Sequence, residues 1–262
     1  TASRNQELLK KGIAYLEKSL ESYTFYSTFA YLGRAYRMLW EETRNPEYWR
    51  KALDSFQETA GIMPTFEEGY VQMALLYGKN DQLKKSLDLL SETELRYPGF
   101  IERGVLEAAH AAEAGQDAPT ATILYNLAAS ITPQSKKIFQ DTILFFLKIG
   151  RMDMAALTLT RLAPYQEPGV VVDAITSLLV LQMEQKQTPL AAAMMRDLRN
   201  QPALQSIQSL WYYSGAVSWM AGQPWETVVY WAAARDQGVT LAQLDPPLSL
   251  VLEKLVNPLI PR

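Results

Sequence analysis

The apolar residues of this chain recur at the spacing of amphipathic helices. In GYVQMALLYGK, the residues Tyr70, Met73, Ala74 and Tyr77 share one face of a helix. The segments STFAYLGRAYRML and LWYYSGAVSWMAG show the same i, i+3/i+4, i+7 spacing. Alternating apolar and polar runs, which are typical of strands, do not occur in the sequence, so the pattern predicts an all-α fold.

Prolines separate these segments at a regular interval. Pro64 and Pro98 lie 34 residues apart, and Pro133 and Pro168 continue the series. Twelve positions before each proline lies a small residue, usually with a bulky one four positions later, in the pairs Ala52/Phe56, Ser86/Leu90, Ala121/Tyr125 and Ala156/Thr160. Residues four apart share a helical face, where a small side chain allows a close helix crossing and a bulky one fills the groove beside it. The predicted unit is helix, turn, helix and a proline-marked turn.

These positions resemble the tetratricopeptide repeat (TPR), whose consensus is W-x₂-L-G-x₂-Y, then Ala, Phe and Pro over about 34 residues. The first repeat supplies Leu32, Gly33, Tyr36, Ala52, Phe56 and Pro64, with an insertion around WEETRNPEYW. The second fits without a gap, the third and fourth are weaker, the fifth is degenerate and the sixth is again distinct around LWYYSGAVSWMAG. The resemblance implies a right-handed α-solenoid of antiparallel helix pairs. An unrelated helical bundle is the alternative.

We expect a single domain over residues 1–262. Its parts are a half repeat (4–24), six repeats (26–66, 67–101, 102–136, 137–171, 172–207 and 208–241) and a capping helix (246–257) that covers the open face of the last repeat. Gly12 and Leu16 take the small and bulky positions of the half repeat. This half repeat corresponds to the second helix of a repeat whose first helix is missing. Together with the absence of an initiator Met, this favours a piece of a larger protein.

Composition narrows the function classes. A formal net charge of −3 provides no basic footprint, which disfavours nucleic-acid binding and polybasic recruitment to membranes. The chain contains no cysteine, so disulfides, thiolate catalysis and Cys-based metal sites are excluded. No apolar run in the sequence approaches the roughly 18–20 residues of a membrane-spanning helix.

Motifs for catalysis are missing from the sequence. It has no Gly-rich nucleotide loop, Walker loop, nucleophile elbow or H-E-x-x-H zinc motif. The single histidine, His110, has Glu107 and Glu113 three positions to either side. His110 could act as a base or a metal ligand, or it could simply be a polar residue on a repeat helix. The polar-residue interpretation is favoured, because one histidine makes a poor metal site. We expect no enzyme, no metal and no cofactor in this chain.

The resemblance implies a concave groove lined by the first helix of each repeat. Its lining positions, carried over residue by residue, select as partner-binding candidates Tyr31, Arg34, Arg37, Gln72, Lys79, Arg103, Glu107, His110, Glu113, Tyr212 and Tyr213, together with Asp141 and Lys148. Arg34 and Arg37 share a helical face and could hold a carboxylate or phosphate, or form a solvated surface pair. The Asn and Lys pattern of the carboxylate clamp that binds chaperone C-termini is absent from the sequence, which disfavours a chaperone co-factor role.

Three functions remain open. The first is a non-catalytic scaffold that binds a protein or peptide in the groove. Within this class, the first repeat and its insertion resemble the soluble repeat region of bacterial O-antigen ligase or polymerase-like membrane proteins, which implies a membrane-anchored parent and the extracytoplasmic side of a bacterial envelope. The second is a glycan- or lipid-precursor-binding module of a cell-surface polysaccharide enzyme whose active site lies elsewhere, and exposed aromatic residues in the groove would favour it. The third is a stand-alone assembly factor for secretion or pili.

Overall fold

The computed structural model describes residues 2–236 and 238, and within these residues the regular structure is helical throughout. The chain divides into two compact units, Thr1–Thr132 and Pro133–Arg262. The division falls within the third expected repeat, 102–136, close to its end. A single domain over 1–262 stays a prediction, and the expected capping helix over 246–257 lies outside the described residues.

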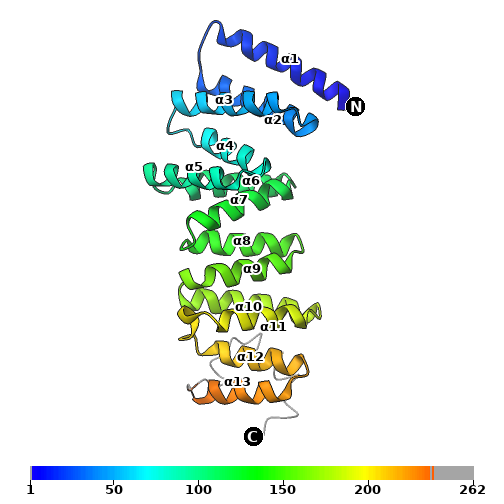
Figure 1. The fold of residues 1–262 in the computed structure, drawn as a ribbon, viewed down its shortest axis with the longest axis vertical. Helices are drawn as coiled ribbons and strands as arrows, with labels where there is room; N and C mark the ends of the chain where they lie inside the picture. Colours follow the sequence, from blue (N-terminus) through cyan, green and yellow to red (C-terminus); the bar gives the residue numbers. More distant parts are fainter. Residues whose placement is uncertain (1, 237, 239–262) are drawn as a thin grey trace. The chain divides into compact units, whose positions relative to one another are not determined.

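The helices of the first unit are connected by short turns (Figure 1). They are α1 (Ala2–Leu20), α2 (Tyr26–Thr43), α3 (Pro46–Ile62), α4 (Glu67–Lys79), α5 (Leu83–Arg96), α6 (Glu107–Ala114) and α7 (Ala118–Ile131). A π-helical turn, Ile101–Leu106, leads directly into α6.

The second unit follows the same plan. Its helices are α8 (Lys136–Lys148), α9 (Met152–Leu162), α10 (Pro168–Glu184), α11 (Thr188–Arg199), α12 (Ser209–Met220) and α13 (Pro224–Asp236), with short 3₁₀ turns at Ala163–Tyr165 and Pro202–Leu204. No helix among those described is both long enough and apolar enough to span a membrane.

Consecutive helices pack as antiparallel pairs in both units (Figure 1). In the first unit α2 packs on α3, α4 on α5 and α6 on α7, and in the second α8 packs on α9, α10 on α11 and α12 on α13. The prediction of an all-α fold of TPR-like helix pairs is therefore confirmed within each unit.

Local chemistry fixes where many of these helices begin. Pro46 and Pro168 open α3 and α10, where a missing backbone N–H costs nothing and the proline φ already fits the helix. The side chains of Asn45 and Ser135 accept hydrogen bonds from the amides of Glu47 and Ile138, at 2.9 and 3.3 Å. These caps satisfy donors that a helix start leaves unpaired.

Small residues lie where the helices of a pair cross. A Cβ atom added at Gly33 of α2 would lie 2.6 Å from Cε1 of Phe56 on α3, so the ring occupies the space that a side chain would need. In the next pair, the Ser86 hydroxyl donates to the carbonyl of Ala74 at 2.9 Å. The sequence prediction of a small residue at the crossing and a bulky one beside it is confirmed here.

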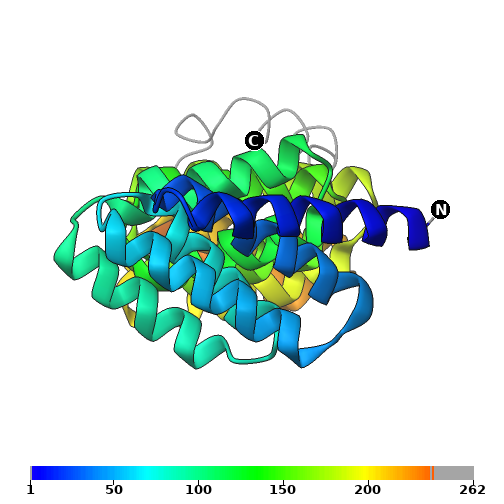
Figure 2. The same cartoon turned by 90° about the horizontal axis from the view of Figure 1, so that it is seen from above.

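The first helix, α1, lies against the α2–α3 pair (Figures 1 and 2). Ile13 is buried against this pair, with Leu9, Leu16 and Leu20 partly buried beside it. Gly12 is exposed, and a Cβ there would meet nothing within 4 Å. The prediction that Gly12 takes a small crossing position is therefore wrong, because α1 is turned so that the next residue faces the core.

Candidate functional site

Two glutamates at the start of α4 connect three successive first helices of the first unit. Glu68 accepts a hydrogen bond from Nε of Arg34 on α2. Glu67 accepts from Nε of Arg103, in the π-helical turn before α6, at 3.1 Å. Both carboxylates lie in the first turn of α4, where the helix dipole favours negative charge. The two ion pairs thus link α2, α4 and the segment that precedes α6.

A hollow of about 370 Å³ lies beside these ion pairs, and we call it the first-helix hollow. It is lined by Arg34, Thr65, Phe66, Glu67, Glu68, Val71, Gln72, Arg103, Gly104 and Ala108. Gly104 allows close packing at its edge, because a Cβ there would lie only 3.2 Å from the Cβ of Glu67. Oε1 of Gln72 is buried and has no hydrogen-bond partner among the described residues, so the lining of the hollow includes an unused acceptor.

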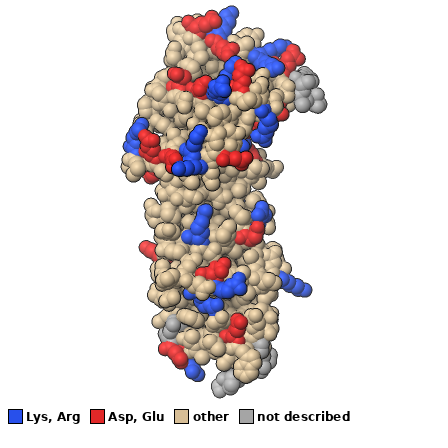
Figure 3. Space-filling model, viewed as in Figure 1, with Lys and Arg blue, Asp and Glu red and all other residues tan. Residues whose placement is uncertain are grey.

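The charges around the hollow are mixed and partly exposed. The side chains of Arg34 and Arg103 are 46% and 58% exposed, so each ion pair contributes only about 0–1 kcal/mol of stability. The hydrogen bond to Glu68 raises the pKa of Arg34 although its burial opposes this shift. A charged group of a partner protein can therefore replace one member of either ion pair at little cost in free energy. On the face shown in Figure 3, Lys and Arg side chains are interspersed with Asp and Glu.

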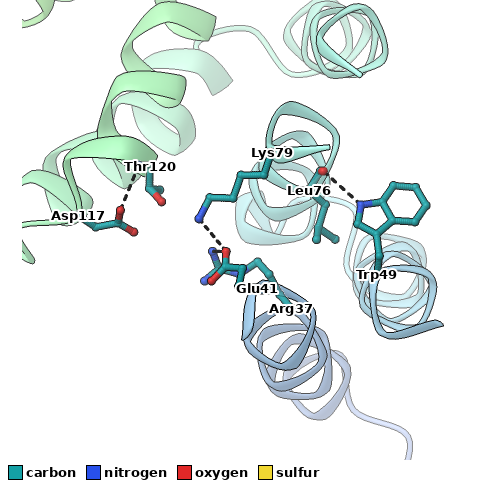
Figure 4. Close-up of polar contacts among 7 residues, drawn as sticks. All are labelled: Arg37, Glu41, Trp49, Leu76, Lys79, Asp117 and Thr120. Carbon is teal, nitrogen blue, oxygen red and sulfur yellow. Dashed lines mark hydrogen bonds and ion pairs between the residues drawn. The ribbon is translucent and has the colours of Figure 1, made fainter. Parts of the chain in front are cut away.

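A second set of charges joins α2, α4 and α7, and Figure 4 shows its arrangement. Glu41 accepts from Nη1 of Arg37 at 3.3 Å and from Nζ of Lys79 at 2.7 Å. Asp117, which caps α7 by accepting from the amide of Thr120 at 3.1 Å, is the second acid of this group. We call Arg37, Glu41, Lys79 and Asp117 the inter-pair cluster, and its formal charges balance.

The inter-pair cluster uses two of the predicted partner-binding residues. Arg37 and Lys79 have side chains only 18% and 17% exposed, and both are held by Glu41. Burial alone would raise the pKa of Asp117, but its hydrogen bonds from Thr120 and the charges of Lys79 and Arg37 outweigh burial and lower it. In this arrangement Arg37 and Lys79 stabilise the packing of neighbouring repeats.

Two variants of Asp117 distinguish the contribution of its charge to stability from that of its helix cap. Asp117→Ala is expected to lower the free energy of unfolding by about 1 kcal/mol, because the cap is lost. Asp117→Asn keeps a capping oxygen and loses only the charge, so a cost of a few tenths of a kcal/mol is expected at neutral pH. The folded-state pKa is lowered, so this charge stabilises the protein above the ordinary carboxyl pKa, and the contribution is lost as the pH falls through the folded pKa.

Urea unfolding of the wild type and both variants, at neutral pH and near pH 3, measures these differences. The Asn variant should approach the wild type in acid, whereas the Ala variant should remain less stable at both pH values. A deficit of the Asn variant that grows in acid would contradict the lowered pKa.

Two of the predicted binding residues on α6, His110 and Glu113, contact α7, the second helix of the same pair. The ring of His110 lies edge-on to Tyr125 of α7, with centroids 5.9 Å apart. Glu113 accepts a hydrogen bond from the Tyr125 hydroxyl at 2.7 Å, while Glu107 is exposed. No group of three or more His, Asp or Glu side chains suited to a metal ion occurs among the described residues. The contacts of His110 and Glu113 with Tyr125 fit the interpretation of polar residues on a repeat helix.

Tyr212 and Tyr213 do not line a groove. They are 8% and 1% exposed, and the ring of Tyr212 stacks on Trp231 of α13 with centroids 6.0 Å apart. The prediction of their exposure is wrong because α12 is covered on all sides, with every residue from 212 to 218 buried. The glycan-binding alternative loses these two aromatic residues and keeps Tyr31, which is 54% exposed.

Asp141 and Lys148 belong to the second unit. Asp141 lines a mainly apolar hollow of about 310 Å³ between α8 and α10, together with Phe139, Leu144 and Asp173 among others. Lys148 ends α8 and is exposed. Tyr31, in the first unit, is 54% exposed, and the guanidinium carbon of Arg34 lies 5.5 Å from its ring centroid.

The structure brings Arg34, Gln72 and Arg103 together and adds Glu67 and Glu68, which the sequence analysis did not select. The repeat pattern could not have selected Glu68, because the insertion in the first repeat makes Leu75, and not Glu68, the residue equivalent to Arg34. On their own, Glu67 and Glu68 are typical of a solvent-exposed helix N-terminus, so their presence in the sequence does not indicate a site.

Comparisons with known proteins give limited information. A scan against protein-family models and a search of curated proteins both return no match. Among solved structures, BtubC (BKLC) from P. vanneervenii matches with 17% identity and a TM-score of 0.31, over 91% of this chain and 94% of that chain. PilF from Pseudomonas aeruginosa matches with 11% identity and a TM-score of 0.28, over 86% and 92%. At these scores the assignment of TPR-like pairs rests on the chain's own packing, and the resemblance to the O-antigen ligase region stays a prediction.

Proposed function

We propose that the chain is a non-catalytic protein-interaction scaffold that binds a segment of a partner protein at the first-helix hollow. The observation that carries this proposal is the pair of partly exposed Arg–Glu contacts beside a hollow built by three successive helix pairs. Repeat folds of this kind recognise partners through surfaces assembled from several repeats.

The chemistry of the hollow defines what it can hold. Arg34 and Arg103 can pair with acidic groups of a partner, and the glutamates released can pair with basic ones. Val71 and Ala108 supply apolar contact, and a shift of the Gln72 side chain would let its buried Oε1 accept a hydrogen bond from a backbone N–H. A segment with charges of both signs around a small apolar side chain matches these groups.

Selection from a random peptide library displayed on phage tests this function, with the intact chain as the target. Peptides that emerge would be synthesised and titrated by fluorescence anisotropy. The double variant Arg34→Gln/Arg103→Gln is expected to bind them at least about tenfold more weakly, because two charge-assisted contacts are lost. Gln72→Ala is expected to cause a smaller loss.

Arg151→Gln is the matched control. Arg151 also forms an ion pair with a nearby acid, Asp153, at 2.7 Å, and is similarly exposed, but it belongs to the second unit. Its replacement should leave peptide binding unchanged. Peptides that bind the double variant as tightly as the wild type would refute the hollow as the site, and a library that yields no binder would count against the scaffold function.

We also propose that the protein works on the extracytoplasmic side of a bacterial envelope. The support is the resemblance of the first repeat, with its insertion, to the soluble repeat region of O-antigen ligase-like proteins. In the structure this insertion lengthens the first pair, so that α2 and α3 have 18 and 17 residues whereas α4 and α5 have 13 and 14. Fractionation of the native cells with detection by antibody tests it. Recovery in the cytosolic fraction alone would refute the proposed setting.

A further inference from the structure

An arginine at the end of α11 is held by two aromatic rings in the second unit. The guanidinium carbon of Arg199 lies 4.0 Å from the ring centroid of Tyr230 on α13 and 5.9 Å from that of Trp211 on α12. The two rings are themselves 6.2 Å apart. Stacking of this kind restricts the orientation of the guanidinium plane. Its hydrogen-bond donors are therefore already oriented before a ligand binds.

Arg199 lines a cavity of about 200 Å³, which we call the Arg199 cavity. The other lining residues are Ala192, Met195, Arg196, Ser214, Val217, Ser218, Gln223, Glu226 and Tyr230. It lies among α11, α12 and α13, so two second helices of successive pairs form its walls. The first-helix hollow, by contrast, is built on first helices and belongs to the other unit.

One donor of Arg199 has no acceptor within the described part of the chain. Its Nη1 atom is buried, and no described residue forms a hydrogen bond with it. A buried donor on a charged group without an acceptor is costly, and a planar guanidinium is suited to the two oxygens of an oxyanion. The Ser218 side chain, in a residue that is only 6% exposed, supplies a hydroxyl to the same cavity.

The charges at the cavity select the kind of anion. The lining carries the positive charges of Arg196 and Arg199 and the negative charge of Glu226, and Arg196 is also paired with Asp197 at 3.9 Å. The Nη1 donor of Arg199 and the Ser218 hydroxyl match the two oxygens of a carboxylate, whereas a phosphate would bring further oxygens and a second negative charge close to Glu226. The volume suits a molecule of a few carbon atoms.

We propose that the Arg199 cavity binds a small-molecule monocarboxylate, with Arg199 as its principal contact. This inference does not depend on the proposed scaffold function. Because Nη1 is closed to solvent, a carboxylate reaches it only when a neighbouring side chain shifts, and the rings of Tyr230 and Trp211 are neighbours of the guanidinium. Binding should therefore change the surroundings of the Trp211 indole, which gives a direct signal.

Titration of the full chain with sodium acetate, followed by NMR, tests the proposal. Sodium chloride keeps the ionic strength constant, and Trp211→Phe assigns the indole resonance. A saturable shift of the Trp211 indole signal is expected with acetate. Arg199→Lys keeps the charge but loses the planar fork, and acetate should bind it at least about tenfold more weakly. Glu226→Gln should bind acetate more tightly.

Arg34→Lys is the matched control, because Arg34 also lies over a tyrosine ring but in the other unit. It should bind acetate as the wild type does. If thermal melting shows that Arg199→Lys does not fold, Ser218→Ala replaces it and should weaken binding severalfold. A linear shift that never saturates, or equal binding by the wild type and the folded variants, would overturn the site. Tighter binding of phosphate than of acetate would overturn the choice of a monocarboxylate.

Discussion

Phe56→Ala is expected to lower the free energy of unfolding of the first unit by about 3–5 kcal/mol. The Phe56 ring has no exposed surface, and it fills the crossing of α2 and α3 beside Gly33. It belongs to one buried cluster with Tyr36, Leu39, Leu53 and Leu76, so its removal leaves a cavity that contacts α2, α3 and α4. Gly33 cannot fill this cavity, because it has no side chain.

Urea unfolding followed by circular dichroism, together with hydrogen exchange of the α3 amides, measures this loss. Phe25→Ala is the matched control: Phe25 precedes α2, is 56% exposed and should cost less than about 1 kcal/mol. Similar losses in the two variants would show that the α2–α3 crossing is not the main packing contact of this unit.

The helix pairs could be predicted from the sequence because their signals are local. A small residue at a fixed distance before a proline, with a bulky one a turn later, already specifies where two helices cross. Phe56 and Ser86 occupy two of these positions, and in the structure they contact Gly33 and Ala74 on the first helix of their own pair. Such contacts join neighbouring helices, so they depend little on the rest of the chain.

The site could be predicted only in part, because its contacts pass from one repeat to the next. The consensus positions led to Arg34, Gln72 and Arg103, which do line one hollow. They also led to Arg37 and Lys79, whose charges Glu41 takes up, although Glu41 is not at a consensus groove position. Whether a charged residue binds a partner or holds two repeats together depends on the opposite charge available on the next helix.

Tyr212 and Tyr213 illustrate a different limit. A consensus position predicts an exposed face only where one side of the helix is uncovered. On α12 the Tyr213 hydroxyl lies 3.4 Å from the hydroxyl of Thr176 on α10, while Tyr212 stacks on α13. Its sequence has little hydrophobic asymmetry around the axis, and this indicates a helix covered on all sides.

Gly33→Ala is expected to lower the free energy of unfolding by about 1–2 kcal/mol, although alanine is the better helix former. The methyl group would lie 2.6 Å from a ring atom of Phe56, and that ring is buried and cannot move aside. The free-energy cost of overpacking, about 1–3 kcal/mol, therefore outweighs the gain of about 1 kcal/mol from the higher helix propensity of alanine. Gly12→Ala, in the interior of α1, meets nothing within 4 Å and should instead raise stability by about 0.5–1 kcal/mol.

The opposite signs of these two substitutions distinguish packing from propensity, and urea unfolding of each variant measures them. A double-mutant cycle with Phe56→Leu isolates the crossing, because a smaller and more flexible side chain should accept the methyl group. The penalty of Gly33→Ala should then fall in the Phe56→Leu background, while the gain from Gly12→Ala should stay the same. Equal penalties in both backgrounds would mean that the ring of Phe56 does not restrict position 33, and the close crossing that defines the first pair would have to be rejected.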